Sequence, residues 1–177
     1  MQDYREFLHE VLIPEDRLQA RIRELGAEIS RDYAGQEILL VCLLKGSVFF
    51  LTDLLKRLST PVAVDFLQVR SYAGTSSTGN FELVRDLSSD IEGRDVLLFE
   101  DVVDTGLTLR KLLGLLGTRQ PRSLKICCLI DKQERREVDV PLDYVGFVVE
   151  KGFLVGYGLD CGEQSRTLPE IFVLEKD

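Results

Sequence analysis

The sequence predicts one α/β domain built on a mainly parallel sheet with helices on its faces. Its 177 residues are too few for a second compact core, because domains rarely split below about 200 residues. Short apolar runs that end in glycine or charged residues alternate with segments whose apolar residues recur every three or four positions. That alternation is typical of strand–helix units with parallel strands. We therefore expect a single domain over residues 1–177.

The first segments along the chain carry the clearest patterns. Residues 14–34 predict an amphipathic helix, since apolar residues recur at helical spacing and a proline followed by two acids suits the first turn. Residues 38–44 are continuously apolar and end at Lys45-Gly46-Ser47, which indicates a strand buried on both faces. A helix over 48–58 and a strand over 62–69 follow.

The segment 71–80 is small, polar and rich in glycine, so it predicts a mobile loop. The remaining elements expected are a returning strand over 81–84, a turn over 90–94, a helix over 105–116, and strands over 95–99, 124–130, 144–149 and 171–174. No internal repeat, low-complexity tract or linker interrupts this order.

Composition and charge narrow the function. There are 22 Lys and Arg against 30 Asp and Glu, which gives a net charge of −8 and predicts no nucleic-acid partner. No apolar run is long enough to span a membrane, and the first ten residues lack an export signal. Four cysteines without repeated spacing and a single histidine argue against a zinc site or a histidine-based hydrolase. We expect a cytoplasmic protein whose chemistry uses carboxylates, lysines and backbone amides.

Ligands of parallel sheets bind beyond the carboxyl ends of the strands, and the densest polar group there lies within residues 96–109. Two adjacent acids end one strand, a third acid follows, and hydroxyl and glycine residues then open a helix whose free amides favour a phosphate. The acids suit magnesium or ribose hydroxyls. These residues are Glu100, Asp101, Asp104, Thr105, Gly106 and Thr108.

Other interpretations of this stretch are weaker. Taken singly, each residue fits an acidic strand end followed by an N-capped helix, with Asp104 as the cap. A phosphoacceptor aspartate would need further acids beside the first strand, where only Glu37 occurs. No Walker-type loop is present, and Cys161 stands where a third dinucleotide-binding glycine would follow Gly156 and Gly158.

Residues 96–109 (VLLFEDVVDTGLTL) resemble the phosphoribosyl pyrophosphate (PRPP) signature of purine phosphoribosyltransferases. The blocks LLKGS, RSY, DIEGRDVLL, IDKQERREV, DYVGF and VGYGLD are similar, in the same order, to segments of the hypoxanthine-guanine type. The resemblance runs from about residue 10 to the end. It implies the type I phosphoribosyltransferase fold, with a hood formed by the N-terminal segment and residues 150–177. It also implies purine salvage with Mg²⁺, in which hypoxanthine or guanine and PRPP give IMP or GMP and pyrophosphate.

The resemblance also implies a role for each matched residue. Asp104 would be the general base at purine nitrogen 7. PRPP and its phosphates would be held by Glu100, Asp101, Thr105, Gly106, Leu107, Thr108, Lys45, Gly46 and Arg166, and magnesium by Glu100, Asp101 and Asp160. The purine would be bound by Lys132 at its 6-oxo group, by Phe153 through stacking, and by Leu154 and Asp160 through their backbone. Ser71 and Tyr72 would begin a loop that closes over the reacting centre.

One departure from the family pattern lies at Lys151-Gly152, where Asp-Lys usually precedes the stacking aromatic. The alternative function on this fold is an RNA-binding or ligand-sensing regulator, a class that usually has Tyr at the position of Asp104 and a basic surface. The resemblance further implies a homodimer or homotetramer.

Overall fold

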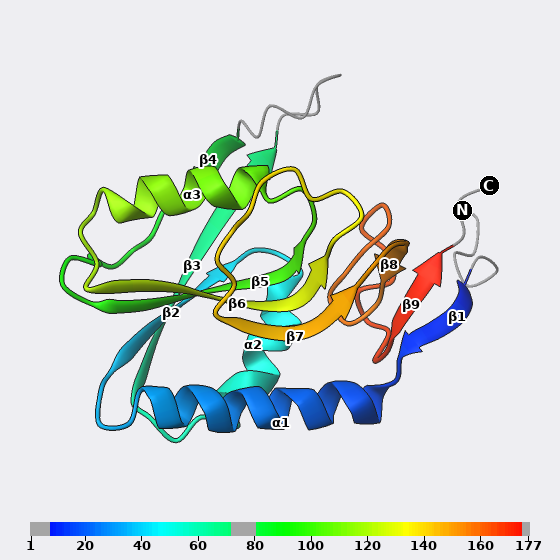
Figure 1. Cartoon of the computed structure of the whole chain (residues 1–177), viewed down its shortest axis with the longest axis horizontal. Coiled ribbons are helices and arrows are strands. Elements are labelled where there is room, and N and C mark those ends of the chain that lie inside the picture. The colour runs from blue at the N-terminus through cyan, green and yellow to red at the C-terminus, as the bar shows by residue number, and fades with distance from the viewer. Residues whose placement is uncertain (1–7, 72–80, 175–177) are drawn as a thin grey trace.

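The computed structural model describes residues 8–71 and 81–174, and its centre is a six-stranded sheet in the order β4-β3-β2-β5-β6-β7. Helices cover both faces of this sheet, with α1 and α2 on one side and α3 on the other (Figure 1). In chain order the elements are β1 (Leu8–Ile13), α1 (Glu15–Asp32), β2 (Ile38–Leu43), α2 (Ser47–Leu55), β3 (Val62–Ser71), β4 (Phe81–Arg85), β5 (Asp95–Val103), α3 (Leu107–Gly117), β6 (Ser123–Lys132), β7 (Tyr144–Val149), β8 (Phe153–Val155) and β9 (Ile171–Leu174).

The fully apolar strand β2 separates two cores. Ile38, Leu40 and Cys42 pack with α1 and α2, while the alternate side chains of β2 pack with α3 on the opposite face. Successive side chains of a strand point to opposite faces, so a strand with a helix layer on each side must be apolar at every position. This confirms the α/β fold with a mainly parallel sheet.

The strand pairing agrees with most of the sequence predictions. Strands β2, β3, β5, β6 and β7 run parallel, and only β4 is antiparallel to its neighbour β3. The helix expected over 105–116 begins two residues later, at Leu107, because Gly106 has a φ of 82° and is its N-cap. The expected loop over 71–80 lies outside the described residues except for Ser71, which ends β3.

A second, smaller sheet has the order β1-β9-β8 and is antiparallel throughout. The sequence patterns did not identify β1 or β8 as strands. A hydrogen-bond network joins this part of the chain to the helices: the Tyr157 hydroxyl donates to Asp53 of α2 over 2.8 Å, and the Gln19 amide of α1 donates to the same carboxylate oxygen over 2.8 Å.

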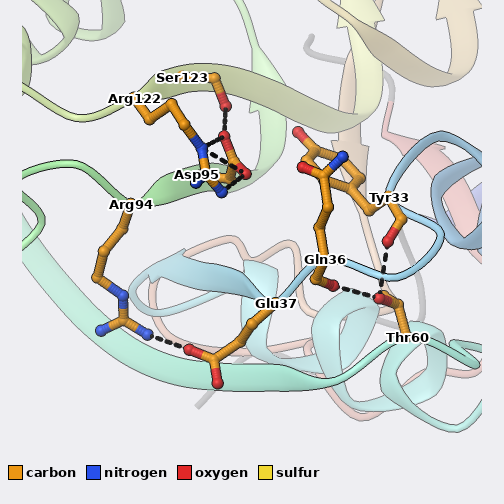
Figure 2. Close-up of polar contacts among 8 residues, drawn as sticks. All are labelled: Tyr33, Gln36, Glu37, Thr60, Arg94, Asp95, Arg122 and Ser123. Carbon is orange, nitrogen blue, oxygen red and sulfur yellow. Dashed lines mark hydrogen bonds and ion pairs between the residues drawn. The ribbon is translucent and has the colours of Figure 1, made fainter.

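Polar side chains make hydrogen bonds and ion pairs around the amino ends of the strands (Figure 2). Arg122 and Ser123 both donate to the buried Asp95 carboxylate, with two Arg122 Nε contacts of 3.1 Å and a Ser123 contact of 2.7 Å. The Thr60 hydroxyl contacts the carbonyl oxygens of Tyr33 and Gln36. The first set of contacts ties the start of β5 to that of β6, and the second ties the segment before β3 to the segment before β2.

The terminal strand β7 is bound by α1 as well as by β6. Arg21 donates from Nε to the Gly146 carbonyl over 3.0 Å and from Nη2 to the Val145 carbonyl over 2.7 Å. In the described parts of the chain, no helix has the length and apolar character required to cross a bilayer.

Candidate active site

Two neighbouring clefts lie at the carboxyl edge of the large sheet. Cleft I, of about 240 Å³, is lined by residues at the ends of β2 and β5 and by the turn before α3. Cleft II, also of about 240 Å³, is lined by residues from the ends of β5 and β6 and from the segment 153–160. Asp104 lines both clefts. A ligand that occupied both clefts would therefore contact Asp104 near its middle.

Cleft I contains the turn that was predicted to bind phosphate. Glu100, Thr105, Gly106 and Thr108 all line it. A Cβ on Gly106 would lie 2.8 Å from the Val138 carbonyl oxygen, and its φ is positive, so only glycine fits this turn. The N-cap Gly106 has no side chain to cap α3, and the Leu107 amide makes only a long contact of 3.4 Å with Thr105 Oγ1, so the first-turn amides can turn to an anion. Because Gly106 is the N-cap, the alternative of Asp104 as the cap is wrong.

The adjacent acids Glu100 and Asp101 face different clefts, as successive strand residues do: Glu100 lines cleft I and Asp101 lines cleft II. Burial raises the pKa of the Glu100 carboxyl well above its usual value, and the nearby Asp101 charge adds to the rise. Burial likewise raises the pKa of Asp101. Among the described residues, Glu100 Oε2 is buried without a hydrogen-bond partner. A bound cation would favour the ionised form of this pair.

Asp104 lies between two cationic side chains. Its Oδ1 is 3.8 Å from Lys132 Nζ, and its Oδ2 is 3.4 Å from Arg135 Nη1. Oδ1 is buried and has no hydrogen-bond partner within the described part of the chain. A buried acceptor in that state is costly unless a ligand supplies its donor.

Cleft II brings together the predicted purine-binding residues. Lys132, Phe153, Leu154 and Asp160 all line it. Only about a tenth of the Lys132 side chain is exposed (11%), so this lysine is not a solvated surface residue. Phe153 and Leu154 belong to the short strand β8, which pairs with β9. The small sheet thus forms one wall of the cleft.

The remaining predicted anion-binding residues form a cluster beside cleft II. Lys45 Nζ is 2.8 Å from Glu163 Oε1, and Arg166 Nη2 is 2.8 Å from Asp160 Oδ1 and 3.3 Å from Glu163 Oε2. Asp160 Oδ2 accepts from the Glu163 amide over 2.8 Å. Each oxygen of Asp160 therefore has one partner within the chain, and each keeps a lone pair that could face a cation.

Gly46 lies directly against the acids. A Cβ at this position would be 1.8 Å from Asp101 Oδ2 and 3.0 Å from the Gly158 carbonyl oxygen. The peptide bond before Lys45 is cis. Leu107, the last of the predicted phosphate-binding residues, begins α3.

The departure at Lys151-Gly152 has a local structural reason. Gly152 has a φ of 115°, a conformation that disfavours any side chain, and its amide donates to Glu134 Oε2 over 3.3 Å. Both residues line a larger hollow of about 560 Å³ that is continuous with cleft II through Lys132 and Phe153.

The sequence reasoning missed three residues in this region: Arg135, Arg136 and Glu163. Arg135 and Arg136 belong to the block IDKQERREV, and Glu163 follows the block VGYGLD. The sequence predictions gave none of the three a role. Of the predicted loop residues, Ser71 ends β3 and Tyr72 lies outside the described residues.

A six-stranded, mainly parallel sheet with a glycine-capped helix start and an acid pair at its carboxyl edge defines the type I phosphoribosyltransferase class of α/β proteins. A sequence model of the phosphoribosyl transferase domain matches residues 14–161. The chain belongs to that family.

Individual relatives agree with this assignment. The chain is 47% identical over 170 residues to the hypoxanthine-guanine-xanthine phosphoribosyltransferase of Tritrichomonas foetus, covering 96% of this chain and 93% of that protein. A crystal structure of a hypoxanthine phosphoribosyltransferase from Staphylococcus aureus has a TM-score of 0.93 at 44% identity, covering 97% of this chain and 94% of that one. The bifunctional protein TilS/HprT of Listeria monocytogenes is 47% identical over 171 residues, and the chain spans only about a quarter (26%) of its length.

Proposed function

We propose that this protein is a purine salvage enzyme that transfers the 5-phosphoribosyl group of PRPP to hypoxanthine or guanine, which gives IMP or GMP and pyrophosphate. One observation carries the proposal: Asp104 is shared by a cleft with a phosphate-binding turn and a cleft with a lysine and an aromatic ring. The names of the relatives support the same reaction. The regulator alternative has no support among these relatives.

On the phosphate side, the turn from Thr105 to Thr108 would hold the 5′-phosphate through the amides at the start of α3 and through its hydroxyls. Lys45 and Arg166 would bind the pyrophosphate group, with the Gly46 backbone beside it. Glu100 and Asp101 would hold the ribose hydroxyls directly or through Mg²⁺.

The acid pair fits magnesium, which proteins usually bind through one or two carboxylates together with substrate phosphates. The buried, unpartnered Glu100 Oε2 supports that assignment. Magnesium, when bound, would neutralise charge on the pyrophosphate leaving group. Asp160 is proposed to hold a second magnesium ion.

On the purine side, Lys132 would donate to the 6-oxo group and Phe153 would stack on the ring, while backbone carbonyls of Leu154 and Asp160 would accept from ring and amino N–H groups. Adenine would place an amino donor against the Lys132 ammonium, and two facing donors cost about 1–3 kcal/mol. Selection for 6-oxopurines follows from this arrangement.

The chemical step breaks the bond between ribose and pyrophosphate while purine nitrogen 9 attacks, and positive charge develops on the sugar. The carboxylates of Glu100 and Asp101 would stabilise that charge. Asp104 would accept the proton at nitrogen 7 as the ring is alkylated. Its two oxygens lie 3.8 Å from Lys132 Nζ and 3.4 Å from Arg135 Nη1.

The test is direct. Purified protein is mixed with PRPP, Mg²⁺ and hypoxanthine, guanine, xanthine or adenine, and nucleotide formation is followed by absorbance. We expect turnover with hypoxanthine or guanine and none with adenine. Asp104→Asn should keep PRPP binding and lose about 10²-fold or more in kcat. Asp90→Asn, at an exposed turn, is the matched control and should match wild type. Absence of nucleotide with every purine would refute the proposal.

We further propose that residues 1–177 act as one domain whose hood comprises the N-terminal segment and residues 150–177, that the loop beginning at Ser71 and Tyr72 closes over the site, and that the enzyme is a cytoplasmic homodimer or homotetramer. Light scattering coupled to gel filtration would measure the oligomer.

A further inference from the structure

Arg136 lies at the carboxyl edge of the large sheet and makes several polar contacts there. Its Nε donates to the Asp104 carbonyl over 2.9 Å, and its Nη2 donates to the Val103 carbonyl over 2.9 Å. The same Nη2 contacts the Asp131 carboxylate and the Lys132 carbonyl. Only 17% of its side chain is exposed. The guanidinium is therefore a partly buried group that joins several backbone and side-chain acceptors.

These contacts join the ends of two neighbouring strands. Val103 ends β5 and leads directly into Asp104, while Asp131 and Lys132 end β6. Strands β5 and β6 pair in parallel up to Val103 and Asp131, after which their backbones separate. Beyond that point no sheet hydrogen bond fixes the distance between Asp104 and Lys132, and Arg136 bridges the gap.

The backbone around Arg136 is itself fixed at both ends. Its amide donates to the Gln133 carbonyl over 3.1 Å, which closes a turn after β6. The next two amides, of Glu137 and Val138, both donate to the Thr105 carbonyl over 3.0 and 3.2 Å. The guanidinium thus extends from a segment whose backbone is held by hydrogen bonds. Through its own hydrogen bond to the Asp104 carbonyl, it restricts the position of Asp104 relative to that segment.

We propose that Arg136 is a positioning residue that sets the separation of Asp104 from Lys132. This inference rests on the proposed function, in which Asp104 acts at purine nitrogen 7 and Lys132 at the adjacent 6-oxo group. Those two ring positions are a fixed distance apart, so the side chains that address them must be held at a matching distance, now 3.8 Å between Asp104 Oδ1 and Lys132 Nζ.

The contacts require arginine rather than any cation. A planar guanidinium donates in several fixed directions at once, here to two carbonyls of one strand end and to a carboxylate of the other. A lysine ammonium can replace the charge but not that geometry. Arg136→Lys separates the two contributions.

The decisive experiment is a double-mutant cycle on the full chain. In the wild-type background we expect Arg136→Ala to lower kcat by about 10²-fold and Arg136→Lys by about tenfold, as a misplaced catalytic group does. In the Asp104→Asn background, where the proton acceptor is already absent, we expect either change to cost less than about threefold. A residue that merely stabilises the fold would lower kcat equally in both backgrounds.

The matched control is Arg110→Ala. Arg110 donates to the Asp139 carbonyl over 2.9 Å, so it anchors the same segment to α3 without contacting Asp104 or Lys132. We expect its kcat to stay within about twofold of wild type. If a thermal melt shows that Arg136→Ala is unfolded, the same double-mutant cycle is measured with Arg136→Lys and with Asp131→Asn. Asp131 contacts the guanidinium and does not line the two clefts.

The outcomes separate the two ideas. If wild-type protein forms no nucleotide from any 6-oxopurine, the proposed function fails. If it forms nucleotide and the Arg136 changes cost as much in the Asp104→Asn background as in the wild-type background, the positioning role alone is overturned. Equal loss in Arg110→Ala would overturn it too.

Discussion

Gly46, in the loop after β2, lies directly against the Asp101 carboxylate. The substitution Gly46→Ala tests whether moving this carboxylate lowers activity while the stability of the fold is kept. The φ of Gly46 is −62°, which alanine adopts freely, so the added methyl acts only through its contacts. Its Cβ would lie 1.8 Å from Asp101 Oδ2, so the carboxylate must move by about 1.6 Å to reach an ordinary contact distance of 3.4 Å. The severe clash is with a side-chain end, whereas the Gly158 carbonyl oxygen at 3.0 Å needs to give by only a few tenths of an ångström, so we expect the fold to survive while the acid moves.

A displacement above 1 Å of a group that holds a reacting sugar costs about 10²-fold in rate. We therefore expect Gly46→Ala to lower kcat/KM for PRPP by about that factor, with a melting temperature within a few degrees of wild type. Gly114→Ala is the control, because nothing lies within 4 Å of its Cβ and alanine stabilises a helix by up to about 1 kcal/mol. A Gly46→Ala enzyme with wild-type kcat/KM would show that Asp101 has no required position.

Three further predictions concern base recognition, pyrophosphate and acid stability. Lys132→Ala should raise KM for hypoxanthine about tenfold or more, by loss of a charged hydrogen bond, and change the calorimetric Kd for PRPP less than about twofold; equal losses would remove this lysine from the purine site. Glu163→Gln should tighten magnesium pyrophosphate about threefold in titration calorimetry, since it removes the acid paired with Lys45 and one of the two acids paired with Arg166, whereas Glu24→Gln, an equally exposed paired acid (65%), should not; unchanged affinity would contradict competition by Glu163. Arg122 holds the pKa of Asp95 below its usual value, so this acid stabilises the fold above about pH 4 and the contribution is lost as pH falls through the lower folded pKa. Asp95→Asn should therefore cost about 1–3 kcal/mol at pH 7 by denaturant melts and progressively less as pH falls below about 4; a cost independent of pH would refute the linkage.

The large sheet could be predicted because its strands carry a strong local signal. Residues 38–44 are apolar at every position, and the structure confirms a strand between two helix layers there. By contrast, β8 has three residues, too few to show a period, and it becomes a strand only through its pairing with β9. The helix start moved to Leu107 because the left-handed conformation of Gly106 is set by the packing of Val138 against it.

Part of the candidate site could likewise be predicted from local sequence, and part could not. Glu100, Asp101, Asp104 and the turn before α3 are contiguous in sequence, so their joint presence at the sheet edge followed from the position of one strand. The contacts of Arg136 with Asp104 and of Glu163 with Lys45 join positions 32 and 118 residues apart. No periodicity reports such pairs, since they depend on how β6 and the tail pack onto β5. Those contacts could only come from the folded chain.

The binding of Arg21 to β7 has a consequence for how copies of this chain behave toward each other. An outermost strand with free peptide groups can recruit a strand from another molecule and seed aggregation. Here the carbonyls of Val145 and Gly146 already accept from a helix of the same chain. Arg21 of α1 thus hinders a strand of another molecule from pairing with β7. The strand β7 itself contains no proline and no β-bulge that would serve this purpose.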